Sequence, residues 1–454
     1  MDYNNSDIII ARATPIGSAA LAVIRISGKQ IIQDIPDFFS IKKPRPRYAH
    51  VGTIKSPNTN ETIDRCILIY FASPRSYTGE EMVEISCHGG EVIVDEIIGE
   101  LVAFGYRLAY PGEFSYRAFK NKKIDLLQAE SIAEKITSQT KQYGVLLQNM
   151  EDGVTSKKMR LLRENIVTLL SVIEHELDFN EAEITHLKHK SIIKQLTAMR
   201  LEIKNIIKLS RQIKQLDAGY RVMIVGYPNV GKSTLFNYIA GQDKALITPI
   251  KGTTRDILET KVKVNNAPIT LYDTAGYRNT KNKIELLGIQ KSLNLLQNMD
   301  AVLIVDQQNP ETIKRELISK KYISNNQDCI LVQNKCDNIT VNEVYNKEQG
   351  LYQISAKNGI GINQILTKLY TTLCSQNNKG SYTNMIVCNK RQLKLLEDGV
   401  VVLSDVLELL KDRASMDVVA SELKTYINIM DELLGKFTSN EILNKIFKGF
   451  CVGK

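Results

Sequence analysis

Residues 226–233, Gly-Tyr-Pro-Asn-Val-Gly-Lys-Ser, fit the phosphate-binding pattern G-x-x-x-x-G-K-[ST]. The run Arg221–Val225 before them is apolar enough for a buried strand, and Ser233–Ala240 after them reads as a helix start, which is the context this pattern requires. Glycines let backbone N–H groups turn toward phosphate oxygens at the positive end of a helix. The pattern predicts a nucleoside-triphosphate site in which Lys232 reaches the β- and γ-phosphates and Ser233 holds Mg²⁺.

Two later segments predict that the base is guanine. Asn334-Lys335-Cys336-Asp337 follows the apolar strand Ile330–Val332. A carboxylate at Asp337 can accept two N–H bonds from guanine, whereas adenine offers the wrong donors on that edge. Paired bonds of this kind reject the wrong base by roughly 10⁴-fold or more, because the buried polar groups are then left unpaired. Ser355-Ala356-Lys357 supplies a plausible backbone contact to the base carbonyl.

Two segments between these predict metal and switch elements. Asp273-Thr274-Ala275-Gly276 follows the strand Ile269–Tyr272, so Asp273 would support Mg²⁺ through water and the Gly276 N–H would sense the γ-phosphate. Within Gly252–Asp256, Thr254 is the expected switch threonine, and with Ser233 it would complete the Mg²⁺ shell. In this order and spacing, the set of motifs indicates a GTPase.

The residues expected to contact GTP lie in the phosphate loop, the switch segments and the base-recognition segments. They are Asn229, Val230, Gly231, Lys232, Ser233, Thr234, Thr248, Pro249, Ile250, Lys251, Gly252, Thr253, Thr254, Asp273, Thr274, Ala275, Gly276, Asn334, Lys335, Asp337, Ser355, Ala356 and Lys357.

One position departs from small regulatory GTPases, in which a glutamine after D-T-A-G orients the attacking water. Here that position is Tyr277, which cannot do so. Asn229 offers a side-chain carbonyl beside the phosphates, suited to a monovalent cation that would stand where an arginine finger stands elsewhere. Glu285 could orient or activate water, and a solvated helix charge is the plainer interpretation of that residue.

The remaining composition is that of a globular protein. The chain has 454 residues, of which 43% are hydrophobic and 24% charged. No apolar run approaches the ~20 residues of a membrane-spanning helix, and the first residues carry no export signal, so a cytoplasmic protein without membrane attachment is expected. Seven scattered cysteines favour free thiols. The net charge of +9 permits a nucleic-acid partner, although lysines spread over the whole chain equally suit a soluble surface.

Apolar periodicity predicts helices on both sides of the GTPase motifs. Residues 124–217 look helical almost throughout, beginning at a capping box of Asp125 and Gln128. Helical stripes resume at Leu396–Leu410 and Leu423–Leu434, and a last helix carries Ile442–Phe450. Because neither flank looks like a complete domain, we expect both to pack into one helical bundle with the GTPase inserted as a loop.

The first 120 residues predict a small α+β domain. Short alternating runs such as Ala22–Ile26, Cys66–Phe71 and Met82–Ser86 read as strands, and helical pattern is confined to Val92–Phe104. The expected fold class is therefore multidomain, with α+β, all-α and α/β parts. Its predicted boundaries are 1–120 for the α+β domain, 121–217 and 379–454 for the helical domain, and 218–378 for the Ras-like P-loop GTPase domain.

Several segments outside the GTPase motifs resemble the MnmE family, also called TrmE, of tRNA uridine-modifying GTPases. Residues 111–136 look like the signature of that family, as do Tyr77–Glu80 with His88–Gly90, Leu177–Phe179, and the terminal Phe450-Cys451-Val452-Gly453-Lys454. The resemblance covers the whole chain and has the same order of parts.

The resemblance implies an activity that spacing alone does not show. Family members form homodimers through the N-terminal domain and act with an FAD-dependent partner, MnmG, in a heterotetramer. Together they add a carboxymethylaminomethyl or related aminomethyl-type group to C5 of the wobble uridine of certain tRNAs. The one-carbon unit comes from 5,10-methylene- or 5-formyl-tetrahydrofolate, and K⁺ promotes pairing of the GTPase domains.

Site residues follow from the resemblance by position. Arg25, Glu84, Lys123 and Lys454 match the family's folate contacts, which suits a ligand that carries carboxylates and an aminopyrimidine ring. Without the family, each of these four reads as an ordinary surface charge. Cys451 matches the cysteine linked to modification, and a lowered pKa would let it act as nucleophile or proton donor.

The potassium site is also implied by the resemblance. Asn229 matches the K⁺-binding asparagine, Thr248, Ile250 and Thr253 would add further oxygens, and Glu285 matches the water-orienting glutamate. Pro249 and Lys251 depart from the smaller or acidic residues usual in that loop: proline narrows the conformations of the loop, and a lysine charge nearby opposes cation binding.

A rival interpretation from another class is a GTP-switched RNA-binding module in ribosome assembly. Such proteins usually carry an RNA-binding appendage, and no aromatic-rich basic platform or zinc knuckle is evident here.

Overall fold

The computed structural model describes residues 7–178, 189–241, 258–265, 267–273, 295–338, 343–374, 385–437, 440–450 and 453. Their contacts divide the chain into two compact units. One comprises Met1–Thr137, Leu146–Ser210 and Ile386–Lys454, and the other Ser138–Val145 and Arg211–Met385. The chain thus leaves the first unit, builds most of the second and returns, as expected for an inserted domain. The predicted boundaries at 120, 217 and 378 remain predictions.

The first unit begins with a six-stranded sheet in the order β3-β4-β5-β2-β1-β6. Helices α1 and α2 pack on the face that carries Ile24, Leu68 and Ile85, where alternate apolar side chains form a core. The bounds are β1 Ile9–Arg12, β2 Leu21–Gly28, α1 Ile31–Phe38, β3 Ala49–Lys55, β4 Thr62–Phe71, β5 Glu81–His88, α2 Glu91–Ala103 and β6 Arg107–Leu108.

The expectation of a single helix in this domain was wrong. The structure adds α1, which contains Pro36, and α3, Glu113–Lys120. In α3 the buried face includes the charged residues Glu113 and Arg117, whose 3.2 Å ion pair is fully enclosed. Apolar periodicity missed α3 because charged side chains occupy part of its inward face.

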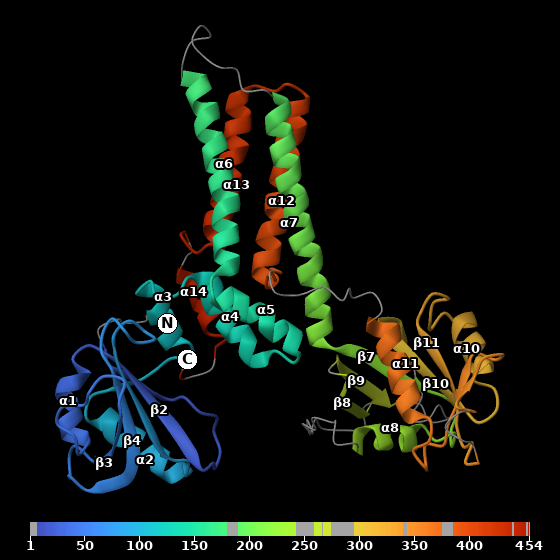
Figure 1. The fold of residues 1–454 in the computed structure, drawn as a ribbon, viewed down its shortest axis with the longest axis horizontal. Coiled ribbons are helices and arrows are strands. Elements are labelled where there is room, and N and C mark those ends of the chain that lie inside the picture. The colour runs from blue at the N-terminus through green and yellow to red at the C-terminus, as the bar shows by residue number, and fades with distance from the viewer. Residues whose placement is uncertain are drawn as a thin grey trace, which may run out of the picture. The chain divides into compact units, whose positions relative to one another are not determined.

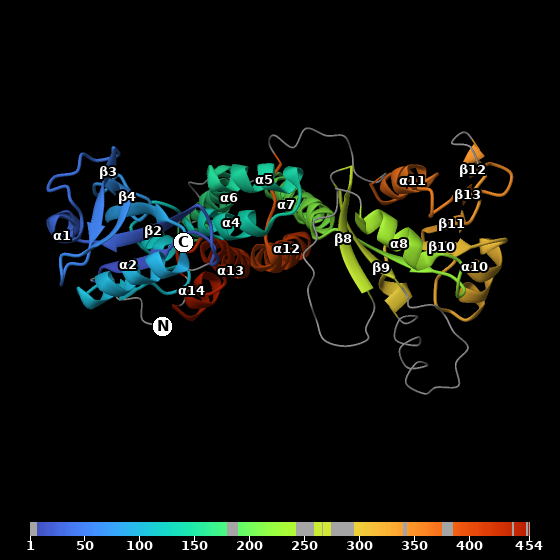
Figure 2. The same cartoon turned by 90° about the horizontal axis from the view of Figure 1, so that it is seen from below.

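Seven helices follow in the first unit and its junctions: α4 Leu126–Thr137, α5 Lys141–Glu151, α6 Val154–Asp178, α7 His189–Ala218, α12 Lys390–Lys411, α13 Met416–Leu433 and α14 Asn440–Phe447. Helices α6, α7, α12 and α13 lie side by side (Figure 1; Figure 2) and share one apolar core. The expected capping box at the start of α4 is confirmed, since the Gln128 N–H donates to Asp125 Oδ1 at 3.0 Å and the Asp125 N–H to Gln128 Oε1 at 2.9 Å.

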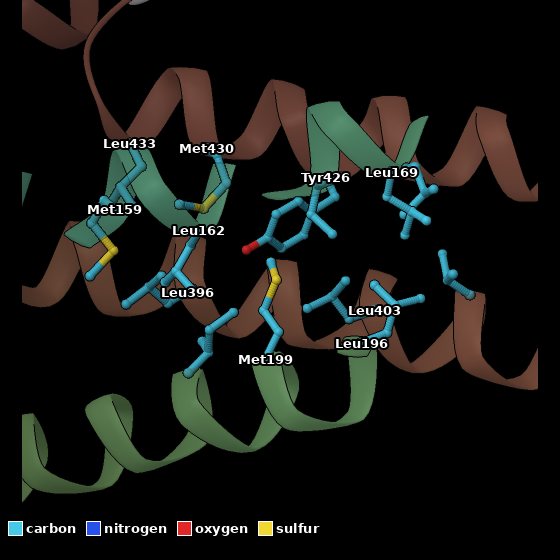
Figure 3. Packing of buried hydrophobic residues seen from close by; sticks show 14 of the residues in the cluster. Met159, Leu162, Leu169, Leu196, Met199, Leu396, Leu403, Tyr426, Met430 and Leu433 are labelled. Carbon is cyan, nitrogen blue, oxygen red and sulfur yellow. The ribbon is translucent and has the colours of Figure 1, made fainter. Parts of the chain in front are cut away.

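Polar contacts join the helices that precede the insertion to those that follow it. Arg163 of α6 donates to both carboxylate oxygens of Asp431 of α13, at 2.6 and 2.8 Å. Arg391 of α12 likewise donates to both carboxylate oxygens of Glu130 of α4, at 2.7 and 3.0 Å. Within the core, the ring of Tyr426 lies near Leu162 and Met199 (Figure 3), and its hydroxyl has no hydrogen-bond partner among the described residues.

The second unit is a seven-stranded sheet in the order β12-β13-β11-β10-β7-β9-β8. Strands β13, β11, β10, β7 and β9 run parallel, while β12 and β8 close the two edges in antiparallel pairing. The bounds are β7 Tyr220–Val225, α8 Lys232–Gly241, β8 Leu258–Val264, β9 Ala267–Asp273, β10 Ala301–Asp306, α10 Pro310–Ser319, β11 Cys329–Gln333, β12 Tyr345–Asn346, β13 Leu351–Gln353 and α11 Ile362–Cys374.

The parallel strands bring the predicted motifs together. The loops that follow β7, β11 and β13 leave the carboxyl edge of the sheet, and β9 ends there at Asp273. Open α/β sheets bind their ligands at this edge. None of the helices in the described ranges has the length and hydropathy to cross a bilayer.

Candidate functional site

The phosphate loop joins buried β7 to α8 through residues 226–231. Asn229 and Gly231 both have left-handed backbone, with φ of 64° and 94°. A Cβ on Gly231 would lie 2.2 Å from the side-chain nitrogen of Asn334, so only glycine fits at that close approach. The loop therefore turns its backbone inward at the start of a helix, which is the arrangement that binds phosphate.

Lys232 is the first residue of α8 and is only 5% exposed. Its Nζ donates to the carbonyl oxygen of Tyr227 at 2.7 Å, across the loop. Burial lowers the pKa of Lys232, and the nearby Asp273 carboxylate partly restores it. Because this buried ammonium group has a carbonyl oxygen as its hydrogen-bond partner and no direct ion pair among the described residues, an anionic ligand in the same loop would stabilise its charged form.

Ser233 and Asp273 form the candidate Mg²⁺ site. The Ser233 hydroxyl donates to Asp273 Oδ2 at 2.8 Å, whereas Oδ1 is buried and has no hydrogen-bond partner among the described residues. Burial raises the pKa of Asp273, against the opposing effects of Ser233 and Lys232. Hydroxyl and carboxylate oxygens are the donors that Mg²⁺ prefers, so the pair fits this ion, directly or through water.

The base-recognition segments meet at the ends of β11 and β13. Asn334 is buried, and its Oδ1 accepts the Ala356 N–H at 3.0 Å. The Ser355 hydroxyl donates to Asp337 Oδ1 at 2.6 Å and orients this otherwise exposed carboxylate. Lys335 and Lys357 are exposed beside them. The structure thus brings the two predicted base segments to the phosphate loop.

Three side-chain contacts in and beside the phosphate loop involve residues that belong to no recognised motif. Gln307, just after β10, donates to the backbone oxygen of Asn229 at 3.0 Å. The Tyr227 hydroxyl donates to Glu316 Oε2 at 2.9 Å, and the side-chain nitrogen of Gln333 donates to the backbone oxygen of Gln307 at 3.1 Å. The only sequence signal for Gln307 is its place at the end of a strand next to β7, because ligand-binding loops gather at that edge.

A second constellation lies on the sheet of the first unit. Arg25 of β2 pairs with Glu84 of β5 across the ladder, with Nη2 to Oε1 at 2.7 Å. The other end of the guanidinium donates through Nη1 to the backbone oxygen of Gly453 at 2.9 Å. The rings of Tyr77 and Phe114 each lie 5.7 Å from the guanidinium carbon. Aromatic rings, an arginine and a carboxylate suit a flat heteroaromatic ligand that carries acid groups.

Lys123, the other described residue of the predicted folate site, contacts a neighbouring loop. Its Nζ donates to the backbone oxygen of Pro74 at 3.0 Å on the exposed surface. The structure therefore unites Arg25, Glu84 and Gly453, while Lys123 contacts the loop that carries Tyr77.

The remaining predicted site residues lie outside the described residues. They are Thr248, Pro249, Ile250, Lys251, Gly252, Thr253, Thr254, Thr274, Ala275, Gly276, Glu285, Cys451 and Lys454, and Tyr277 also lies there.

Comparison with known proteins finds family matches along almost the whole chain. The model of the "GTP-binding protein TrmE N-terminus" family matches residues 8–123, and that of the "MnmE helical domain" family matches residues 126–451. The tRNA modification GTPase MnmE of Aquifex aeolicus is 34% identical over 449 residues, 98% of this chain and 99% of its own length. That of Coxiella burnetii is 33% identical over 461 residues, all of both chains.

Among solved structures, the G domain of the T. maritima FeoB iron transporter is 25% identical and covers 34% of this chain and 98% of its own. Its TM-score is 0.27, so the family assignment depends on the sequence comparisons.

Proposed function

Since this chain belongs to the MnmE family of tRNA modification GTPases, we propose that it hydrolyses GTP to drive modification of tRNA. The observation that carries the proposal is the hydrogen bond of Ser233 to the buried Asp273, beside the buried Lys232, with Asn334 and Asp337 at the same edge. When Mg²⁺ is bound there, it neutralises charge on the phosphates. Lys232 then binds phosphate oxygens, and Asp337 selects guanine.

For the chemical step, we propose a K⁺-assisted mechanism. Asn229 would bind K⁺ with oxygens of Thr248, Ile250 and Thr253, and Glu285 would orient water in place of the absent glutamine. GTP turnover should then be much faster in K⁺ than in Na⁺ at equal ionic strength. Equal rates in the two salts would exclude the K⁺-assisted mechanism. Glu285→Ala should bind GTP and lose turnover, and wild-type turnover in that variant would remove Glu285 from the mechanism.

For the one-carbon step, we propose a tetrahydrofolate site at Arg25 and Glu84, completed by Lys123 and Lys454, with Cys451 as the reactive thiol. The Arg25–Gly453 contact supports this, because Gly453 lies next to Lys454 and two positions after Cys451 in the chain. Arg25→Lys keeps the charge but cannot bridge Glu84 and the Gly453 oxygen in the same way. It should weaken 5-formyl-tetrahydrofolate binding at least tenfold, while Arg45→Lys on the exposed surface should not.

We also propose the partners that the family implies: the chain forms a homodimer, and this homodimer acts with an MnmG-type FAD protein. The test supplies an unmodified tRNA transcript, GTP, the tetrahydrofolate donor and the flavoprotein, followed by nucleoside analysis. A C5-modified wobble uridine that depends on this chain supports the proposal. Normal tRNA with defective ribosomal subunits in a deletion strain would instead favour a role in ribosome assembly.

A further inference from the structure

The positive charge of the helical bundle is concentrated on α7. That helix carries seven lysine and arginine residues against two carboxylates, a net charge of +5. In α6 and α12 the basic and acidic residues balance at four each, and α13 has four acidic residues against one basic. The even spread of lysines that the sequence suggests does not hold in the folded bundle.

Four of these lysines form one exposed face, which we call the α7 lysine face: Lys190, Lys194, Lys204 and Lys208. The opposite side of α7 is buried through Ile192, Leu196, Met199, Ile203, Ile206 and Ile207 in the bundle core. The spacing of both sets follows the helical repeat, so the lysines point away from the core.

No carboxylate of α7 neutralises this face. Glu202 is half-buried and forms an ion pair with Lys158 of α6. Asp217 lies near the end of the helix and accepts hydrogen bonds from the Gln139 and Thr140 N–H groups. Among the described residues, none of the four lysines forms an ion pair with an acidic side chain.

We infer that the α7 lysine face is a docking surface for the phosphate backbone of a structured RNA, which rests on the proposed tRNA function. At 1.5 Å per residue, the pairs Lys190/Lys194 and Lys204/Lys208 lie about 21 Å apart along the helix. The uncharged Thr197 and Leu201 lie between them. Two separated cationic pairs can contact phosphates on either side of an RNA groove, without reading sequence.

The chemistry favours RNA over other anionic partners. A membrane-surface helix needs an exposed apolar face, but the apolar face of α7 is buried and Leu201 is the only large apolar side chain that is exposed between the lysine pairs. RNA offers a dense row of phosphates, and lysine ammonium groups bind these as point charges.

The test compares two full-length variants with the same change in charge. One carries Lys190→Gln, Lys194→Gln, Lys204→Gln and Lys208→Gln. The control carries Lys42→Gln, Lys43→Gln, Lys347→Gln and Lys368→Gln, four exposed lysines elsewhere. Affinity for an unmodified tRNA transcript is measured between 50 and 200 mM KCl, and melting temperatures check that both variants fold.

Neutralising the α7 lysine face should weaken binding at least tenfold and reduce the slope of log K against log salt by about 3, because each phosphate contact contributes about 0.7 to 0.9. The two half-variants, Lys190→Gln/Lys194→Gln and Lys204→Gln/Lys208→Gln, should each remove about half of that slope. The control should stay within twofold of the wild type.

An unchanged slope in the four-lysine variant overturns the inference, as does a wild-type chain that binds no transcript. Loss of flavoprotein binding with intact RNA binding would assign the face to an acidic protein instead. GTP hydrolysis by the wild-type chain is assayed separately. If the chain splits GTP and modifies tRNA while the slope is unchanged, the inference fails and the proposed function stands.

Discussion

Asn334 connects the base-recognition segment to the phosphate loop, because its side-chain nitrogen donates to the backbone oxygen of Val230 at 2.8 Å. The two residues are 104 positions apart in the chain. With the Ala356 N–H on its Oδ1, one buried amide holds three segments in register. Its role is therefore to position the site, whether or not it contacts the nucleotide.

Asn334→Ala should weaken GTP binding at least tenfold and lower the free energy of unfolding of the nucleotide-free protein by about 2–3 kcal/mol. It leaves the Val230 oxygen and the Ala356 N–H unpaired in a buried place. Nucleotide titration and urea unfolding measure the two effects. Asn325→Ala, at an exposed position of the same unit, should change neither. Wild-type affinity in Asn334→Ala would contradict the positioning role.

Asp273→Asn should stabilise the nucleotide-free protein while abolishing Mg²⁺-dependent turnover. Because burial raises the pKa of Asp273 above its ordinary 3.8, the folded state binds the proton more tightly than the unfolded state. Stability therefore falls as pH rises from 3.8 through the raised pKa, and the charged form is the costly one at neutral pH. Removing that charge should raise stability by about 1–3 kcal/mol.

The predicted gain in stability is measured as the melting temperature without nucleotide, and the predicted loss of activity as GTP turnover with Mg²⁺. A lower melting temperature in Asp273→Asn at pH 7 would show that the carboxylate stabilises the empty site, contrary to the prediction.

The Arg163–Asp431 contact predicts pH-dependent stability of the bundle. Burial alone would raise the pKa of Asp431, but hydrogen bonds from Arg163 and Lys436 outweigh it and lower the pKa. The pair therefore stabilises the fold above the ordinary pKa of 3.8, and this contribution is lost as pH falls through the lowered value. Asp431→Asn should cost about 2–4 kcal/mol at pH 7, and less as the pH falls below 3.8.

Chemical unfolding at a series of pH values tests this. Asp405→Asn, the same change at an exposed site of α12, should stay within about 0.5 kcal/mol of the wild type. A cost for Asp431→Asn that does not depend on pH would contradict the ion-pair explanation.

Tyr426 offers a stabilising substitution. Its fully buried hydroxyl has no partner among the described residues, and burial raises its pKa. Tyr426→Phe should raise the free energy of unfolding by about 1 kcal/mol, because it removes an unsatisfied polar group and keeps the ring. Tyr106→Phe is the matched change of opposite sign, since its hydroxyl donates to Asp34 at 3.0 Å. A destabilised Tyr426→Phe would reveal a partner for the hydroxyl.

Sequence reasoning succeeded where local pattern and global fold agree. The strand before Gly226, the capping box at Asp125 and the two-sided helical bundle were all predicted, because apolar period and cap chemistry encode them locally. Both base-recognition segments were predicted to contact the guanine. They come together through the bond between Ala356 and Asn334, since parallel strands deliver their following loops to one edge.

The failures have physical reasons too. Pro36 inside α1 and the buried charges of α3 contradict the patterns by which helices are recognised. The Gln307 contact to the phosphate loop is a long-range polar bond that leaves no periodic trace. The Gly453 contact to Arg25 joins residues 428 positions apart, so family resemblance could suggest their proximity but the local pattern could not.

That last contact bears on how the protein is handled. Gly453 is buried, with φ of 91°, and a Cβ there would lie 2.4 Å from the backbone oxygen of Arg12. An affinity tag or fluorescent fusion attached after Lys454 would therefore start one residue from a crowded, enclosed spot beside Arg25. A tag in that position is therefore expected to disturb the surroundings of Arg25, and its effect on activity should be judged against the untagged chain.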